Sequence, residues 1–178
     1  MIKEQFFPTT VYGKDIKLDN NTLANHIISW SKQDQGVKKT NVNGWHSTTD
    51  MHLKAEYQLL VQELYRMQEE IYQEEWLDRK PRLGNMWANI NYSGGYNRPH
   101  IHPNCLFSGV YYVKSTKESG VLVVNDPRPG IQTMMPTRKE GKPPKHLWRE
   151  AKIEPVPGRI IMFPAWLWHC VEPNKTND

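Results

Sequence analysis

Two histidines, His100 and His102, are separated by one residue, and a proline flanks the pair on each side. On an extended backbone, residues i and i+2 point to the same side, so both imidazole rings can approach one point in space. Imidazole nitrogens are ordinary ligands of zinc, copper and iron. The spacing therefore favours a metal site over the simpler interpretation, in which the two histidines are polar strand residues or buried, hydrogen-bonded groups.

A third ligand must come from a distant part of the chain, and the best candidate is His169 in the segment RIIMFPAWLWHC. It follows His102 by 169 − 102 = 67 residues, so such a site would form only on folding. Few acidic residues lie near the pair, which weakens ion pairing as an explanation, and Gly94 and Gly95 would let the backbone pass close to a ligand. We expect ordinary hydrogen bonding or solvation for the other histidines, namely His26, His46, His52 and His146.

The composition indicates one folded domain. A chain of 178 residues can bury a substantial core, and its seven Trp and eight Tyr must supply much of the apolar burial. The net charge of +4 is mild, and the basic residues are scattered apart from 38–39 and 138–145. We find no basic helix and no recognised nucleic-acid motif, so nucleic acid is not an expected partner. An anionic substrate, or the edge of a nucleic acid, would nevertheless suit this charge.

Cys105 and Cys170 lack the spacing of a disulfide framework and are expected to be free thiols. The first ten residues do not have the pattern of a signal peptide. No apolar run approaches about 18 residues, the length typical of a membrane-spanning helix. We therefore expect a cytoplasmic protein without a membrane partner, and the sequence does not predict its oligomeric state.

Apolar periodicity predicts two helices in the first half of the chain. Residues 18–31 begin with candidate capping residues and present apolar side chains at helical spacing, and residues 53–76 repeat Leu, Met and Ile every three or four positions. The polar stretch 33–49 between them is predicted as a loop.

Short apolar or alternating stretches predict strands elsewhere. Residues 6–12 are expected to form an edge strand, because Pro8 excludes a central one, and the segment SGGYN at 93–97 is predicted as a turn. A long surface loop is expected at 130–152. The other predicted strands are 86–92, 107–114, 121–125 and 160–163.

This order of elements predicts a mainly β domain with flanking helices. Helices followed by many short strands are typical of a sandwich or barrel with helices packed outside it. We expect a single domain, 1–178, in which an N-terminal strand and helices within 1–84 pack on a metal-binding core formed by 85–178.

Several segments resemble one enzyme superfamily in order and spacing. They are GWHS (44–47), WANIN (87–91), HIHP (100–103), SGVYYV (108–113), DPR (126–128) and FPAWLWHCVEPN (163–174). With these pieces, the chain resembles the 2-oxoglutarate- and Fe(II)-dependent dioxygenases, and most closely a prolyl-hydroxylase-like bacterial and phage branch. The resemblance implies a double-stranded β-helix, or jelly roll, with iron at one open end. It also implies Fe(II), 2-oxoglutarate and O2, with ascorbate as a further candidate cofactor.

The same resemblance implies a reaction and a ligand set. The reaction is hydroxylation of a C–H bond in a small-molecule or peptide substrate, with release of succinate and CO2. His100 matches the first iron ligand and His169 the distal one, whereas His102 stands where most branches have a carboxylate. Dianionic 2-oxoglutarate could then balance the charge of the ion. Asp126 is an alternative carboxylate ligand, although it also suits the turn in which it lies.

The resemblance further assigns residues to 2-oxoglutarate. Tyr112 matches a strand tyrosine that holds the outer carboxylate, with a core aromatic as the alternative, and Asn89 and Asn91 could line the pocket. Relatives carry an Arg or Lys shortly after the distal histidine, at a position that falls at or beyond the last residue here. The expectation is therefore a jelly roll without its last strand that holds 2-oxoglutarate weakly, unless Arg159 or Arg128 supplies the cation.

Two other function classes suit the same residues. One is a cupin-like dioxygenase with three histidines that does not use 2-oxoglutarate. The other is a jelly-roll binding protein without catalytic activity, with or without a bound metal.

Overall fold

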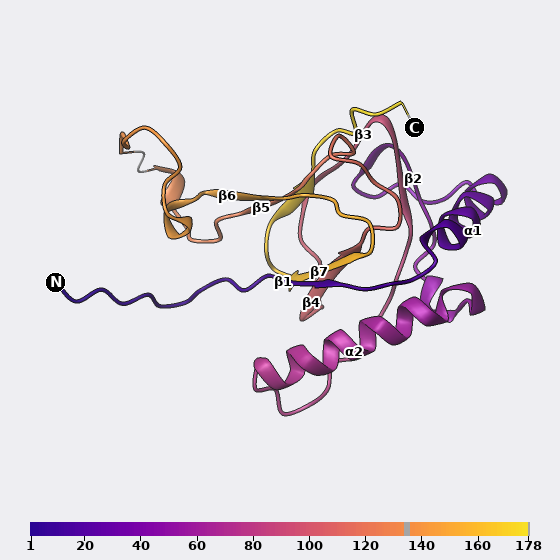
Figure 1. The fold of residues 1–178 in the computed structure, drawn as a ribbon, viewed down its shortest axis with the longest axis horizontal. Helices are drawn as coiled ribbons and strands as arrows, with labels where there is room; N and C mark the ends of the chain where they lie inside the picture. Colours follow the sequence, from indigo (N-terminus) through magenta and orange to yellow (C-terminus); the bar gives the residue numbers. More distant parts are fainter. Residues whose placement is uncertain (134–135, 178) are drawn as a thin grey trace.

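The computed structural model describes residues 1–133 and 136–177. Within them the chain forms two antiparallel sheets, with helices α1 and α2 on the outside of the strands (Figure 1). Apolar side chains from both sheets meet in one cluster, which includes Leu122, Val124, Ile161 and Phe163. This shared core makes the strands a flattened barrel rather than two independent sheets.

The smaller sheet has the order β1-β7-β4, with β1 at Tyr12–Asp15, β7 at Arg159–Pro164 and β4 at Phe107–Tyr111. Its central strand, β7, alternates between two apolar environments. Ile161 faces the core between the sheets, whereas Ile160 contacts the helical side. The sheet is therefore covered on both faces, as the continuous apolar sequence of β7 requires.

The larger sheet has the order β2-β3-β8-β5-β6, and all its neighbouring strands are antiparallel. Leu122 and Val124 of one strand and Val171 of the next point into the core between the sheets. The five strands are β2 (Asn41–His46), β3 (Asn89–His100), β8 (His169–Val171), β5 (Leu122–Asn125) and β6 (Glu150–Ile153).

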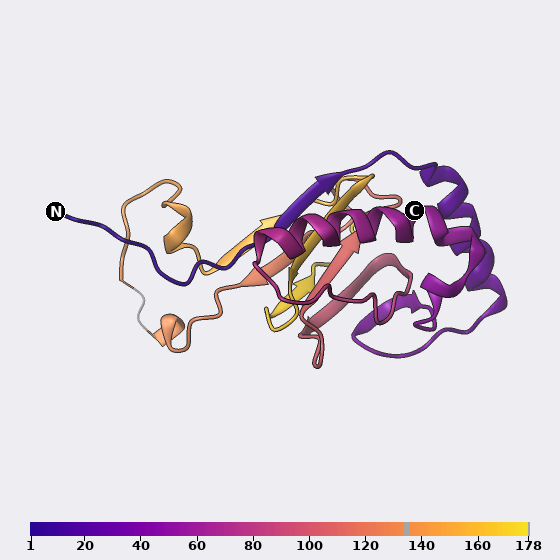
Figure 2. The same ribbon diagram turned by 90° about the horizontal axis from the view of Figure 1, so that it is seen from below.

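The two long helices cover the outer surfaces. Helix α1 (Asn20–Gln33) begins where the side chain of Asp19 accepts a hydrogen bond from the backbone N–H of Thr22, a standard N-terminal cap. Its buried residues pack with Trp45 of β2. Helix α2 (Gln58–Glu74) lies along the smaller sheet, as Figure 2 shows, and its buried side chains contact Ile160. Both predicted helices are thus confirmed, with shifted ends.

Four details differ from the sequence-based expectations. Residues 33–49 contain β2, and the predicted loop 130–152 ends in β6. Both strands are largely polar, and they form because each pairs in register with a neighbouring strand, β2 with β3 and β6 with β5. The first strand is a sheet edge, as predicted, but it lies at Tyr12–Asp15 rather than 6–12. The segment 93–97 is not a turn between strands, because it lies inside β3.

Within β3, the Gly-rich segment forms a bulge. Val42 pairs with Tyr96, whereas Gly44 pairs with Asn91, so the residues between Asn91 and Tyr96 are looped out of the ladder. A Cβ atom at Gly95 would lie 2.4 Å from the carbonyl oxygen of Asn43, so only glycine fits there. The bulge bends β3 so that its second half can pair with β8.

No helix among the described residues has both the length and the apolarity needed to cross a bilayer. The most prominent irregular feature is the connection between β5 and β6, which extends far from the barrel (Figures 1 and 2).

Candidate metal centre

Three histidines meet at one end of the barrel. His100 ends β3 and His169 begins β8, and the two residues stand directly opposite each other in the antiparallel register. His102 lies two residues beyond the end of β3, where its backbone N–H donates to the carbonyl oxygen of Ala165 at 2.9 Å. This hydrogen bond joins the His-x-His segment to the connection between β7 and β8, which leads into the third histidine at the start of β8.

The three imidazoles converge as the spacing predicted. Their candidate ligand nitrogens all lie within 4.8 Å of one another. The ring centroids of His100 and His102 are 4.9 Å apart, and those of His100 and His169 are 4.2 Å apart. The Nε2 atoms of His102 and His169 are separated by 3.2 Å. One ion could therefore contact all three rings without a large rearrangement.

Backbone carbonyls orient two of the rings. Nδ1 of His100 lies 2.7 Å from the carbonyl oxygen of Arg98, and Nδ1 of His169 lies 2.8 Å from that of Leu167. Because a carbonyl oxygen only accepts, each Nδ1 carries the proton and each Nε2 presents a lone pair. Such second contacts are typical of metal-binding histidines.

Burial keeps two of the imidazoles uncharged. His169 is only 4% exposed, and burial lowers its pKa to about 4. Burial, reinforced by the neighbouring His169 and His100, also lowers the pKa of His102 to about 4. Neutral imidazoles are the form that binds a metal ion. The donor set, with no carboxylate among the described residues of the cluster, fits a divalent transition metal that keeps positions open for other ligands.

Tyr112 follows β4 and lies inside the barrel, against the core cluster of Leu122 and Phe163. Alternation along the strand accounts for this position, because the adjacent Tyr111 packs instead on the helical side. Burial raises the pKa of Tyr112 to about 12. Among the described residues its hydroxyl has no hydrogen-bond partner, so an O–H donor inside the barrel remains available to a ligand.

The two predicted asparagines lie in different environments. Asn91 is partly buried and donates from Nδ2 to Oδ1 of Asn97 at 3.0 Å, and its own Oδ1 is buried without a partner in the described part of the chain. Asn97 is 6% exposed, and the sequence argument did not single it out. Asn89 is exposed and pairs with His46 across the β2–β3 ladder.

The candidate cations and the alternative carboxylate ligand are all engaged elsewhere. Arg159 donates to Asp15 through Nε and Nη2 at 2.6 and 2.8 Å, at the end of β7 remote from the histidines. That end is about 16 Å from Pro164 by strand rise. Arg128 is held by Asp126, with Nε to Oδ1 at 2.9 Å. The structure brings none of the three residues into the histidine cluster.

A fourth histidine lies close to the cluster and was expected to have only an ordinary role. His46 is 6% exposed, and its ring stacks on that of Trp87 with centroids 5.4 Å apart. The other neighbour of Trp87 is His102, at 5.6 Å. The sequence hardly indicated that His46 and Trp87 would lie next to His102, because this arrangement depends on the pairing of His46 with Asn89. The only signal was the GWHS segment.

Comparisons with known proteins agree with this geometry. A Pseudomonas putida prolyl-4-hydroxylase structure is similar, with 14% sequence identity and a TM-score of 0.62 over 93% of this chain and 85% of that one. At this identity the likeness shows the fold, and it confirms the predicted jelly roll. No curated protein matches the chain. The model of a family described as "Putative 2OG-Fe(II) oxygenase" matches residues 85–178, which include all three histidines. Because the match covers more than half of the 178 residues, the chain belongs to this family of 2-oxoglutarate- and Fe(II)-dependent oxygenases.

Proposed function

We propose that this oxygenase hydroxylates a C–H bond of a small-molecule or peptide substrate and holds its iron with His100, His102 and His169. The observation that carries the proposal is the convergence of the three ring nitrogens within 4.8 Å, inside the segment that matches the family. Bound Fe(II), with 2-oxoglutarate and O2, supplies the oxidising chemistry and yields succinate and CO2.

The residues of the chain would bind and orient the reactants. Imidazole ligands carry no negative charge and leave the charge of the ion uncompensated by the protein, so a dianionic co-substrate is favoured next to it. Tyr112 would donate a hydrogen bond to the outer carboxylate of 2-oxoglutarate, and Asn91 would line the same interior. The apolar cluster around Leu122 and Phe163 excludes water from that space.

We also propose the domain arrangement and setting that the sequence suggested. Residues 1–178 act as one domain, in which 85–178 carry the metal site and the helices within 1–84 support the strands from outside. The protein would work in the cytoplasm, with ascorbate as a reductant that keeps the iron ferrous.

Iron binding and succinate release test the proposal together. Fe(II) would be titrated into the protein without oxygen, and succinate would then be measured after 2-oxoglutarate and O2 are added. Alanine at His100, His102 or His169 should abolish both iron binding and succinate release. His146→Ala is the matched control, because this histidine is exposed in the β5–β6 connection. Full iron occupancy in the His102 variant would refute the three-histidine assignment.

The all-imidazole cluster also favours one alternative, a three-histidine dioxygenase that does not use 2-oxoglutarate. Within the described residues no carboxylate joins the cluster, and Arg159 and Arg128 are both already paired with aspartates. The alternative predicts consumption of O2 with a suitable substrate when no keto acid is present. Strict dependence on 2-oxoglutarate would exclude it.

A further inference from the structure

The connection between β5 and β6 covers residues 126–149, and its described parts, 126–133 and 136–149, form an arm that extends away from the barrel (Figures 1 and 2). We call it the β5–β6 arm. The jelly roll does not need it, since strands β5 and β6 pair directly with each other and a short turn would join them. An extension of this length usually has a role of its own.

The charge of the chain is concentrated in this arm. It contains six basic and two acidic residues, a difference of 6 − 2 = +4, and the whole chain also has a net charge of +4. The remaining residues are therefore neutral in sum. The six basic residues are Arg128, Arg138, Lys139, Lys142, Lys145 and Arg149.

Part of this charge is neutralised, and part is available. Asp126 holds Arg128. The side chains of Arg138, Lys139 and Lys145 are exposed and form no ion pair within the described residues. Arg138 and Lys139 also line an open cavity of about 430 Å³. The arm thus presents a hollowed basic surface to solvent.

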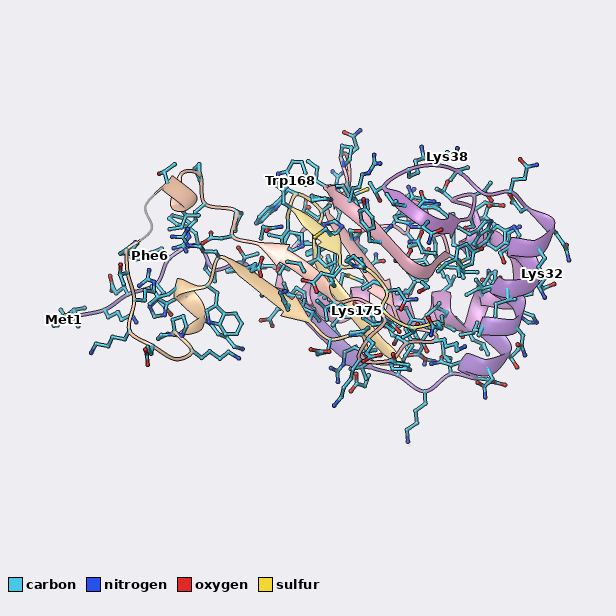
Figure 3. The ribbon with its side chains drawn as sticks, turned by 90° about the horizontal axis from the view of Figure 1, so that it is seen from above. Met1, Phe6, Lys32, Lys38, Trp168 and Lys175 are labelled. Carbon is cyan, nitrogen blue, oxygen red and sulfur yellow. The ribbon has the colours of Figure 1, made fainter. Side chains whose placement is uncertain are left out.

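The arm begins at the end of the barrel that carries the histidines. Val124 of β5 pairs with His169, and the arm starts two residues later. Between them, the backbone N–H of Asn125 donates to the carbonyl oxygen of Trp168 at 2.9 Å. The side chain of Trp168 is 52% exposed. Figure 3 shows it on the barrel, between the arm and helix α1, which carries Lys32. Trp168 alternates with the buried Leu167 and His169 and therefore points outward. The arm leaves the barrel two residues beyond Val124, the pairing partner of His169.

We propose that the β5–β6 arm binds an acidic segment of a polypeptide substrate whose reacting residue lies at the histidine cluster. The inference rests on the proposed function and names its substrate class. An extended polypeptide spans about 3.3 Å per residue, so an acidic stretch several residues away from the reacting one could reach the arm.

The arm suits an acidic peptide better than a nucleic acid. Proteins that bind single strands stack bases on open aromatic rings. The arm's one tryptophan, Trp148, has Nζ of Lys142 over its ring at 4.8 Å, and its Nε1 donates to the carbonyl oxygen of Pro143. Glu140 also interrupts the basic run. A row of phosphates would meet this acid, whereas a peptide can place its carboxylates on either side of it.

Binding of a labelled oligoglutamate peptide tests the proposal, measured by fluorescence anisotropy at low salt. The variant Arg138→Gln/Lys139→Gln removes two charges from the arm. The variant Lys32→Gln/Lys38→Gln is the matched control, because it removes two exposed charges at the far end of the molecule (Figure 3). We expect the arm variant to bind about tenfold more weakly and the control to bind as the parent does. Added salt should also weaken binding by the parent protein.

Three results would overturn the inference. They are equal affinity of the arm and control variants, equal affinity of the parent for oligoglutamate and oligoglutamine, and tighter binding of an oligothymidylate than of oligoglutamate. The assay needs neither iron nor turnover, so it is independent of the test of the proposed function. Loss of succinate release with intact peptide binding would refute only the reaction.

Discussion

The adjacent tyrosines Tyr111 and Tyr112 offer a way to separate co-substrate binding from fold stability. The Tyr112 hydroxyl lies inside the barrel without a hydrogen-bond partner among the described residues. Tyr112→Phe therefore breaks no protein hydrogen bond, and the free energy of unfolding should not fall. If this hydroxyl donates to a carboxylate of 2-oxoglutarate, its loss costs about 1.5–3 kcal/mol of binding energy. The affinity for 2-oxoglutarate should then fall roughly 10- to 100-fold.

Tyr111→Phe is the matched control, because it removes the same atom from the opposite side of the strand. The Tyr111 hydroxyl donates to Oδ1 of Asn20 at 2.5 Å and joins β4 to helix α1. Losing this bond should destabilise the fold by about 1 kcal/mol. For a chain of this size, the melting temperature should fall by roughly 2–4 °C, with an unchanged affinity for 2-oxoglutarate.

Both effects can be measured on the same samples. Calorimetric titration of 2-oxoglutarate without oxygen, with Mn(II) in place of Fe(II), gives the affinity without turnover. Thermal unfolding followed by circular dichroism gives the stability. The reasoning fails if Tyr112→Phe retains the parent affinity, which would make Tyr112 an ordinary core aromatic. It also fails if Tyr111→Phe weakens 2-oxoglutarate binding as much as Tyr112→Phe does.

Three further outcomes follow from the structure. The depressed pKa of His169, about 4 against an ordinary value of 6.5, means that acid protonates the unfolded chain before the folded one. The free energy of unfolding of the metal-free protein should therefore fall as the pH drops from 7 to 5, and this residue should contribute about 2 kcal/mol of that loss. Urea unfolding at several pH values would compare the parent with a His169→Gln variant. The variant should lack this part of the pH dependence. Gly120→Ala should destabilise the fold by at least about 2 kcal/mol, because φ is +84° and the added Cβ would lie 2.1 Å from the Glu172 carbonyl oxygen. Gly84→Ala is the control, because its added Cβ would meet no atom within 4 Å, and it should leave the stability unchanged in the same denaturation assay. Arg159→Gln should leave 2-oxoglutarate affinity unchanged in the calorimetric titration, since this side chain binds Asp15 away from the histidines; a large loss of affinity would mean that it contacts the co-substrate.

Local patterns were sufficient wherever one stretch of chain contains all the information. The two long helices follow from apolar spacing, and the convergence of His100 and His102 follows from their separation by one residue. The opposite orientations of Tyr111 and Tyr112 follow from strand parity. The sequence also offered His169 as the best third ligand, and the family resemblance supported this choice and added the jelly roll, because relatives show which distant segments meet.

Strand pairing was much harder to predict from the sequence. Strands β2 and β6 are short and mostly polar, and few of their residues favour β-structure. They form because neighbouring strands offer hydrogen-bond partners in register, and that interaction lies between segments rather than within one. For the same reason, the Gly-rich segment is a bulge in β3 instead of a turn.

By itself the sequence determined the helices, the facing sides of several strands and the two neighbouring histidines, because spacing along one backbone decides each of them. Only the tertiary structure placed His46 and Trp87 beside His102 and Arg159 at the remote end of β7. It also joined the basic arm to the metal-bearing end through Asn125 and Trp168. These arrangements depend on the register of strands that lie far apart in the chain, and a difference of a few residues in that register would have separated the same side chains.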